Sequence, residues 1–202
     1  MTAIPSYVEI HIHSIDGHIS AFTQSDPEAV RRVFDHIQPN KIFEQRQLVV
    51  ASGHSMAVFP CAAIVRLDVV MDGFPDWEFH FGVSDVQEIT EEEFRQRYHP
   101  GHGRDPLLLP PGAPVTAFGE IELANGERLF TEIHTHVEPR LPVEESIFFQ
   151  QILSAHSLYS RKQGGGAILI NPANIVRLTF YPGPASTPPN ALPAEPLSLE
   201  VE

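Results

Sequence analysis

Residues 64–67 read I-V-R-L, and residues 175–178 read I-V-R-L again. The identity lies within a longer gapless alignment of residues 56–69, M-A-V-F-P-C-A-A-I-V-R-L-D-V, with residues 167–180, A-I-L-I-N-P-A-N-I-V-R-L-T-F. Each copy contains two short apolar runs, which are typical of two consecutive strands. The recurrence predicts that the chain contains an internal duplication.

The sequence upstream of each I-V-R-L supports the same alignment. Residues 33–37, V-F-D-H-I, lie over residues 148–152, F-F-Q-Q-I. Residues 42–47, I-F-E-Q-R-Q, lie over residues 158–163, L-Y-S-R-K-Q. Because the matches keep the same order, a duplication is favoured over coincidence.

The first half predicts a hairpin, a helix and then two more strands. Val8, Ile10 and Ile12 alternate with polar residues, which is the period of a half-buried strand. Asp16-Gly17 then predicts a tight turn, because such turns need residues that tolerate a positive φ. S-D-P-E at 25–28 predicts a helix start, with a capping residue, a proline at the first helical position and an acid in the first turn.

The second half predicts the same order of elements. Its hairpin spans residues 118–134 around Asn125-Gly126. Its helix begins at Pro142, and Glu144 and Glu145 lie in the first turn. Each half therefore predicts a ββαββ unit.

A different segment separates the two halves. Residues 77–83, W-E-F-H-F-G-V, alternate aromatic and polar side chains and predict one more strand. Residues 89–94, I-T-E-E-E-F, combine a capping box with a hydrophobic staple, so a helix is expected to begin there. Residues 99–114 are rich in proline and glycine and predict a linker.

Together these patterns predict an α+β fold built from two ββαββ units, each a small antiparallel sheet or barrel covered by one helix. The expected boundaries are 1–84 for the first unit, 85–115 for the inserted helix and linker, and 116–182 for the second unit. Residues 183–202 are Pro-rich and acidic without periodicity, and a disordered tail is expected there.

Composition narrows the classes of partner. The chain has 26 acidic and 13 basic residues and a formal net charge of −13, which disfavours nucleic acid and anionic membrane surfaces as partners. A single cysteine, Cys61, allows no internal disulfide, and no signal peptide or membrane-spanning apolar run is recognised. A cytoplasmic protein is expected, although a periplasmic protein without disulfides has the same pattern.

Two histidine pairs are the candidate metal ligands. Residues 9–13 read E-I-H-I-H and residues 132–136 read E-I-H-T-H. Within a strand His11 and His13 lie on one face, as do His134 and His136, and imidazoles near a carboxylate suit zinc or another transition metal. The two pairs precede and follow their respective turns, so the duplication does not make them equivalent. Solvated or interfacial histidines on polar strand faces are the simpler interpretation of the pattern.

The remaining motifs are better explained by structural roles than by catalytic or ligand-binding roles. G-H-S-M-A at 53–57 resembles a nucleophile elbow, but strand-like sequence follows Ser55 where a helix is required, so a hairpin turn is expected. G-G-G at 164–166 lacks the lysine and hydroxyl residue of a phosphate-binding loop and also predicts a turn. Arg66 and Arg177 are expected to form structural ion pairs, with Glu120, Glu122 or another acid.

No complete catalytic constellation is present, so a non-enzymatic binding or assembly module is the first hypothesis. It would act through protein–protein contacts, with a protein partner or by self-association through exposed sheet edges. The alternative is a transition-metal-binding protein or metalloenzyme that uses His11, His13, His134 and His136. A third class, small-molecule binding in a pocket between the units, also stays open.

Overall fold

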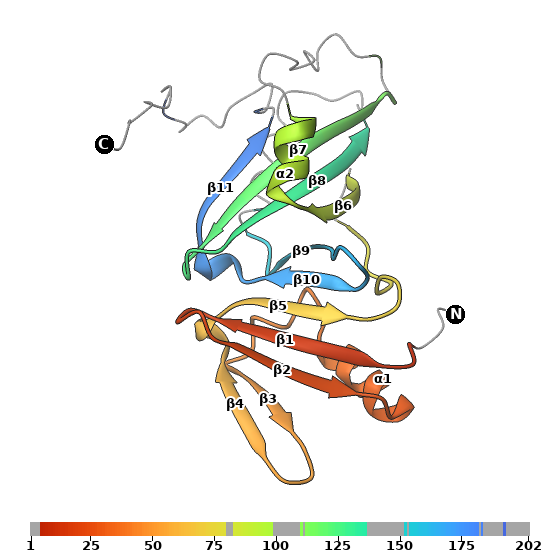
Figure 1. The fold of residues 1–202 in the computed structure, drawn as a ribbon, viewed down its shortest axis with the longest axis vertical. Helices are drawn as coiled ribbons and strands as arrows, with labels where there is room; N and C mark the ends of the chain where they lie inside the picture. Colours follow the sequence, from red (N-terminus) through yellow and green to blue (C-terminus); the bar gives the residue numbers. More distant parts are fainter. Residues whose placement is uncertain are drawn as a thin grey trace.

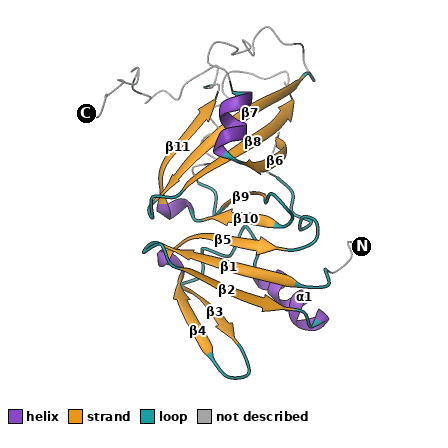
Figure 2. Ribbon diagram, viewed as in Figure 1, coloured by secondary structure: helices purple, strands orange, loops and turns teal. Residues whose placement is uncertain are grey.

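The computed structural model describes residues 5–79, 83–98, 110, 112–136, 152, 154–181, 183 and 192. Strands dominate this part of the chain, and the helices are short (Figure 2). The strands are β1 (Val8–Ser14), β2 (Ile19–Gln24), β3 (Gln47–Ala51), β4 (Met56–Pro60), β5 (Ile64–Val70), β6 (Val83–Ile89), β7 (Pro114–Leu123), β8 (Arg128–His136), β9 (Leu158–Arg161), β10 (Ala167–Ile170) and β11 (Ile175–Tyr181). The helices are α1 (Pro27–His36) and α2 (Glu91–Arg97), and the 3-10 turns η1 (Cys61–Ala63) and η3 (Pro172–Asn174) precede β5 and β11.

Nine of these strands form one mixed sheet in the order β11-β7-β8-β6-β9-β10-β5-β1-β2, and β3 and β4 form a separate hairpin. The sheet extends along the molecule and twists, so that β7, β8 and β11 are steeply inclined to β1, β2 and β5 (Figure 1). All neighbouring pairs are antiparallel except β6 and β9, which meet in parallel at Gln87 and Arg161.

The predicted α+β fold of two separate ββαββ units is therefore wrong. Strands from both halves of the chain share one sheet, because β10 pairs with β5 along Ala167–Ile170. All four residues of β10 are buried, so this strand needs a cover on both faces and cannot lie in an outer hairpin. Its counterpart in the alignment, β4, alternates exposed and half-buried residues and pairs only with β3.

The predicted helix caps and hairpin turns are confirmed. Asp26 caps α1 by accepting a hydrogen bond from the backbone N–H of Ala29, and Pro27 opens the helix. Thr90 and Glu93 form the predicted capping box of α2. The turns at Asp16-Gly17 and Asn125-Gly126 join β1 to β2 and β7 to β8, and both glycines have a positive φ.

The predicted strand over residues 77–83 is wrong in its described part. Residues 77–79 are irregular, and the strand begins at Val83. The ring of Phe79 stacks on those of Phe74 and Tyr159, both at 5.4 Å, and Trp77 also contacts Tyr159. Aromatic contacts, and not strand pairing, therefore hold residues 77–79. The predicted helix at Pro142, and most of the predicted linker and tail, lie outside the described residues.

Two apolar clusters lie on opposite faces of the strands around β5. On one face Leu67 and Val69 pack with β1, α1 and the inner side of the β3–β4 hairpin. On the other face Ile168 and Ile170 pack against Ile121, Leu123 and Leu129 of β7 and β8. The sheet therefore curls over β10, and the turn between β7 and β8 reaches β5.

A third cluster holds α2 to the outer face of β7, β8 and β11 (Figure 1). Phe94 contacts Phe118, Phe130 and Tyr181, with ring centroids 5.1 to 5.8 Å apart. No helix among the described residues is both long enough and apolar enough to span a bilayer.

Candidate functional site

The first histidine pair lies on the expected face of β1. His11 and Glu9 lie side by side, with Nε2 3.3 Å from Oε2, and His11 is opposite Asp68 of β5. His13 is opposite Arg66 and is buried. The two imidazoles therefore share a face but differ in environment, because His11 remains partly exposed.

The second pair lies far from the first. His134 and His136 are at the end of β8, and His134 Nε2 is 3.9 Å from a carboxylate oxygen of Glu132. His13 contacts Glu127, the residue before β8 begins, and His134 is seven residues further on, or about 23 Å along a strand. The four imidazoles are not brought together. Within the described ranges, no group of three or more His, Cys, Asp and Glu is arranged to hold a metal ion.

His13 instead belongs to a buried ionic cluster centred on Asp68. Arg66 donates from Nε at 2.6 Å and from Nη2 at 2.8 Å to the two oxygens of Asp68. Lys162 Nζ donates to the same carboxylate at 2.8 Å. Arg66 also donates from Nη1 to Glu127, in the turn between β7 and β8. The expected structural ion pair of Arg66 is confirmed.

The electrostatics of this cluster follow from burial and pairing. Burial opposes ionisation of Asp68, but the hydrogen bonds from Arg66 and the neighbouring cations outweigh it and hold the pKa of this carboxyl far below its usual range. Burial would also lower the pKa of His13, but the carboxylates of Asp68 and Glu127 prevail and raise it above 6.5. Both carboxylates are about 3.5 Å from the ring, 3.6 Å for Asp68 and 3.5 Å for Glu127, so their effect is mainly electrostatic.

The ionic cluster is not arranged for catalysis. Asp68 is 2% exposed and Arg66 is 6% exposed, so a substrate has no access to them. Each charge is already neutralised by a partner within the cluster. We conclude that the cluster connects the turn between β7 and β8 to strands β1 and β5.

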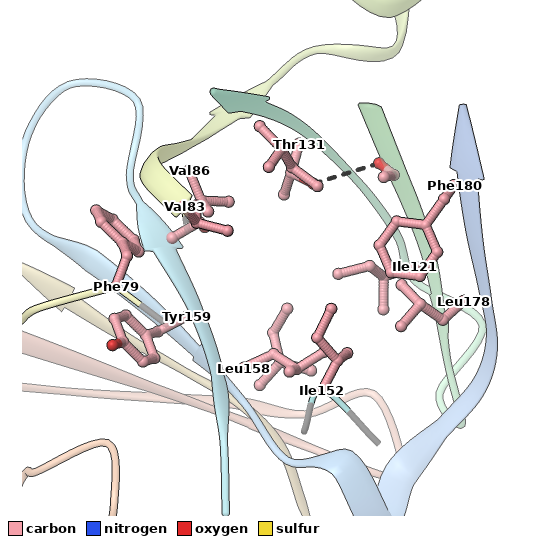
Figure 3. A pocket seen from close by; sticks show the side chains of 14 residues that line it. Phe79, Val83, Val86, Ile121, Thr131, Ile152, Leu158, Tyr159, Leu178 and Phe180 are labelled. Atoms are coloured by element: carbon pink, nitrogen blue, oxygen red, sulfur yellow. Dashed lines mark hydrogen bonds between the residues drawn. The ribbon is translucent and has the colours of Figure 1, made fainter. Parts of the chain in front are cut away.

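A cavity lies against the inner face of β7, β8 and β11, on the side opposite α2 (Figure 3). Its volume is about 80 Å³. Ile121, Leu178 and Phe180 line one side and Phe79 and Tyr159 the other. The remaining lining residues are Val83, Val86, Gly119, Thr131, Ile133, Ile152, Leu158, Ser160 and Ile170.

The described side chains that line the cavity are almost all apolar, and few of them have polar groups. Thr131 donates a long hydrogen bond of 3.5 Å to the carbonyl of Gly119 (Figure 3). A Cβ atom at position 119 would lie 2.7 Å from Thr131 Oγ1, so this close approach requires glycine. None of the described lining residues has a carboxylate, imidazole, amine or thiol, so an apolar ligand suits the cavity better than a reacting one.

The hairpin of β3 and β4 presents a different kind of surface. Its inner side chains, among them Leu48, Val50 and Phe59, pack on the core. Its outer side chains are all exposed, and we name them the hairpin face: Gln47, Val49, Ala51, Met56, Val58 and Pro60. Figure 1 shows that the hairpin projects beyond β2, away from the body of the molecule.

The hairpin turn confirms that Ser55 is not on a nucleophile elbow. The backbone N–H of Ser52 donates to the carbonyl of Ser55 at 2.8 Å, and strand β4 follows directly. The glycines at 164–166 likewise form the turn between β9 and β10, each with a positive φ.

Sequence reasoning missed both the hairpin face and the burial of His13. Residues 48–51 and 56–59 are apolar on both sides of their strands, which indicates a second apolar surface as well as the one facing the core. Arg66 and Asp68 are two residues apart in a strand, so a same-face ion pair was also accessible from spacing alone.

No protein-family model matches the chain, and neither the curated protein sequences nor the solved structures include a significant match. Its function therefore has to be argued from these geometries alone.

Proposed function

We propose that the chain is a non-enzymatic binding or assembly module that acts through protein–protein contacts at the hairpin face. The observation that carries the proposal is the gathering of exposed apolar side chains on one face of the hairpin. Single exposed apolar residues are ordinary, but a contiguous group is typical of an interaction surface.

The arrangement of the hairpin supports this role. Val49 and Val58 lie directly opposite each other, as do Ala51 and Met56, so that the apolar side chains form a continuous strip. Met56 is 70% exposed. The hairpin has only two strands, so a partner that buries the apolar side chains of its outer face would also stabilise it.

The proposal places the protein in the cytoplasm and excludes nucleic acid as the partner. The single cysteine is buried, and its thiol lies 3.6 Å from the carbonyl of Ile42, so the fold needs no disulfide. The net charge of −13 opposes binding to phosphate backbones.

Site-specific photo-crosslinking in cells tests the proposal. A benzophenone amino acid at Val58 is expected to give a discrete protein adduct, identifiable by mass spectrometry. The matched control is the same amino acid at Val176, which is an exposed strand valine on β11, outside the hairpin. Equal adduct yields from the two positions, or none from Val58, would contradict a role for the hairpin face.

A second candidate function rests on the cavity. Its lining is almost wholly apolar, and it is large enough for a small apolar group but not for a drug-sized ligand. The test is thermal denaturation with benzene, an apolar probe of suitable shape. A rise in Tm that Gly119→Ala abolishes would favour this function, and an unchanged Tm would oppose it.

The transition-metal alternative has no support from the separated histidine pairs. Elemental analysis of untagged protein, purified without chelator, decides it. We expect well below one metal ion per chain. Stoichiometric metal that is lost in the His11→Ala/His13→Ala variant would revive the alternative.

A further inference from the structure

Exposed apolar side chains gather at one end of the molecule. Among the described residues, the large hydrophobic side chains that are most exposed are Ile15, Ile19, Val49, Met56, Val58, Val176 and Leu192. Five of these seven lie between residues 15 and 58, in the β1–β2 turn, the start of β2 and the β3–β4 hairpin. These elements belong to the lower half of the molecule in Figure 1, and the β3–β4 hairpin forms the end of that half.

The segment from β2 through the hairpin, here called the neutral end, carries no net charge. Residues 19–60, from β2 through the hairpin, contain four basic and four acidic residues. The rest of the chain contains 9 basic and 22 acidic residues, which is the whole formal charge of −13. The hairpin face itself has no ionisable side chain.

This distribution of charge discriminates between partners. A basic partner would be drawn to the acidic remainder of the chain and not to the neutral end. A second copy carries the same −13 charge, so it is repelled everywhere except at the neutral end. The exposed apolar residues therefore lie where two copies can approach each other with least repulsion.

The hairpin face is also suited to pairing with itself. A two-fold interface uses the same patch on both subunits, so that patch must tolerate its own charges and shape. The Val49–Val58 pair lies in the middle of the hairpin, with uncharged side chains on both sides of it. Two such faces pack at the usual distance of stacked sheets, about 10 Å.

We infer that the partner of the hairpin face is a second copy of this chain, bound hairpin to hairpin about a two-fold axis. The inference rests on the proposed function and names its partner. Standard interfaces use about 20–30 residues on each side, and the hairpin face has six. The dimer is therefore weak and in rapid exchange with the monomer.

Sedimentation velocity of the full chain tests the inference. Over a series from about 1 μM to 1 mM, we expect the sedimentation coefficient to rise from the monomer value towards that of a dimer. High salt is expected to tighten the dimer, because it screens the repulsion between the two acidic bodies. A monomer at every concentration and salt overturns the inference.

Charge substitutions locate the interface. Val58→Lys and Val58→Glu are each expected to raise the dimer Kd at least tenfold, and an equimolar mixture of the two is expected to recover association. Val176→Lys is the matched control and should leave the Kd unchanged. Circular dichroism confirms that each variant is folded. A dimer that tolerates Val58→Lys as well as Val176→Lys overturns the inference.

The inference and the proposed function fail differently. A chain that stays monomeric, but whose Val58 crosslinks to a different protein in cells, refutes the self-association and leaves the binding function standing. A monomeric chain without any Val58 adduct refutes both.

Discussion

Strands β5 and β11 contain the same four letters, I-V-R-L, in two very different positions. β5 lies between β1 and β10, and six of its seven residues are buried. Among the described strands β11 lies at the edge and pairs only with β7, and none of its residues is buried. Both copies follow a 3-10 turn, so their local structure is alike and their surroundings differ.

The arginines show the difference most clearly. The Arg66 side chain is 7% exposed and joins two carboxylates inside the protein. The Arg177 side chain is 58% exposed and lies 3.1 Å from Glu122 and 3.5 Å from Glu120. The expected ion pairs are confirmed at both sites, but only Arg66 is removed from water.

The comparison teaches that four identical residues specify a strand but not its place in a sheet. Burial of β5 depends on β10 and on the turn between β7 and β8, which come about 60 to 100 residues later in the chain. Sequence-distant partners therefore decide whether the same arginine is a core residue or a surface residue.

Arg66→Ala should cause the largest loss of stability. Removing this side chain leaves Glu127 without its arginine and Asp68 with only Lys162 and His13 as cationic neighbours, and breaking a buried ionic network in this way costs about 3–5 kcal/mol. That is a large share of the stability of a typical domain. Urea denaturation followed by circular dichroism measures it, and a loss below about 1 kcal/mol would show that the cluster is hydrated.

Leu67→Ala should follow, with a loss of about 3 kcal/mol, since Leu67 is fully buried in the core around β1 and β5. The matched variant is Leu178→Ala in β11, whose side chain already borders the cavity. It should lose about half as much. Urea denaturation measures both losses. Equal losses would mean that the edge strand β11 and the central strand β5 are packed equally tightly.

The pH dependence of stability should depend on His13. Because its pKa is raised in the folded state, its bound proton stabilises the fold fully below about pH 6.5. That contribution is lost as the pH rises through the folded pKa. We expect the free energy of unfolding to fall as the pH rises above about 6.5 in the wild type, and to fall less steeply in His13→Gln.

The control for this experiment is His11→Gln, on the same strand face but partly exposed. A change of slope that appears in His13→Gln and equally in His11→Gln would not be specific to the buried ring. If the His13→Gln and wild-type curves are also parallel, the ring carries no proton that is linked to folding.

Arg177→Ala should have the smallest effect, below about 1 kcal/mol, because exposed ion pairs contribute little. Differential scanning calorimetry at low and high salt checks it. Any difference from the wild type should shrink at high salt, and a loss as large as that of Arg66→Ala would abolish the contrast between the two strands.

Short-range signals predicted the elements well. The caps of α1 and α2, both hairpin turns with glycine, and the strands around I-V-R-L follow from residues within a few positions of each other. The arrangement of those strands did not follow, because β10 pairs with β5 across about 100 residues and no local pattern encodes that choice.

The candidate sites divide in the same way. The shared face of His11 and His13 follows from strand alternation, and the structure has it. The separation of the two histidine pairs depends on which strands lie between β1 and β8, and only the sheet order supplies that. Residues on both sides of β3 and β4 are apolar, but only the structure shows which side packs on the core and which side is exposed.

The turn η3 has a consequence for how the chain is made. The side-chain amide of Asn171 donates to the carbonyls of Cys61 and Ile64, at 3.0 and 2.9 Å, and that of Asn174 donates to Ala62 and Ile64, at 3.1 and 2.8 Å. These bonds span 107 to 112 residues. At about 10 residues per second, a ribosome adds the two asparagines about 10 s after the carbonyls that they satisfy.

Until then the N-terminal half has neither these donors nor the β10 partner of β5. During that interval the edge of β5 that later pairs with β10 is exposed, and an exposed strand edge can pair wrongly with other chains. The last third of the sequence thus closes the sheet, and chaperone demand should be greatest in the seconds before it emerges.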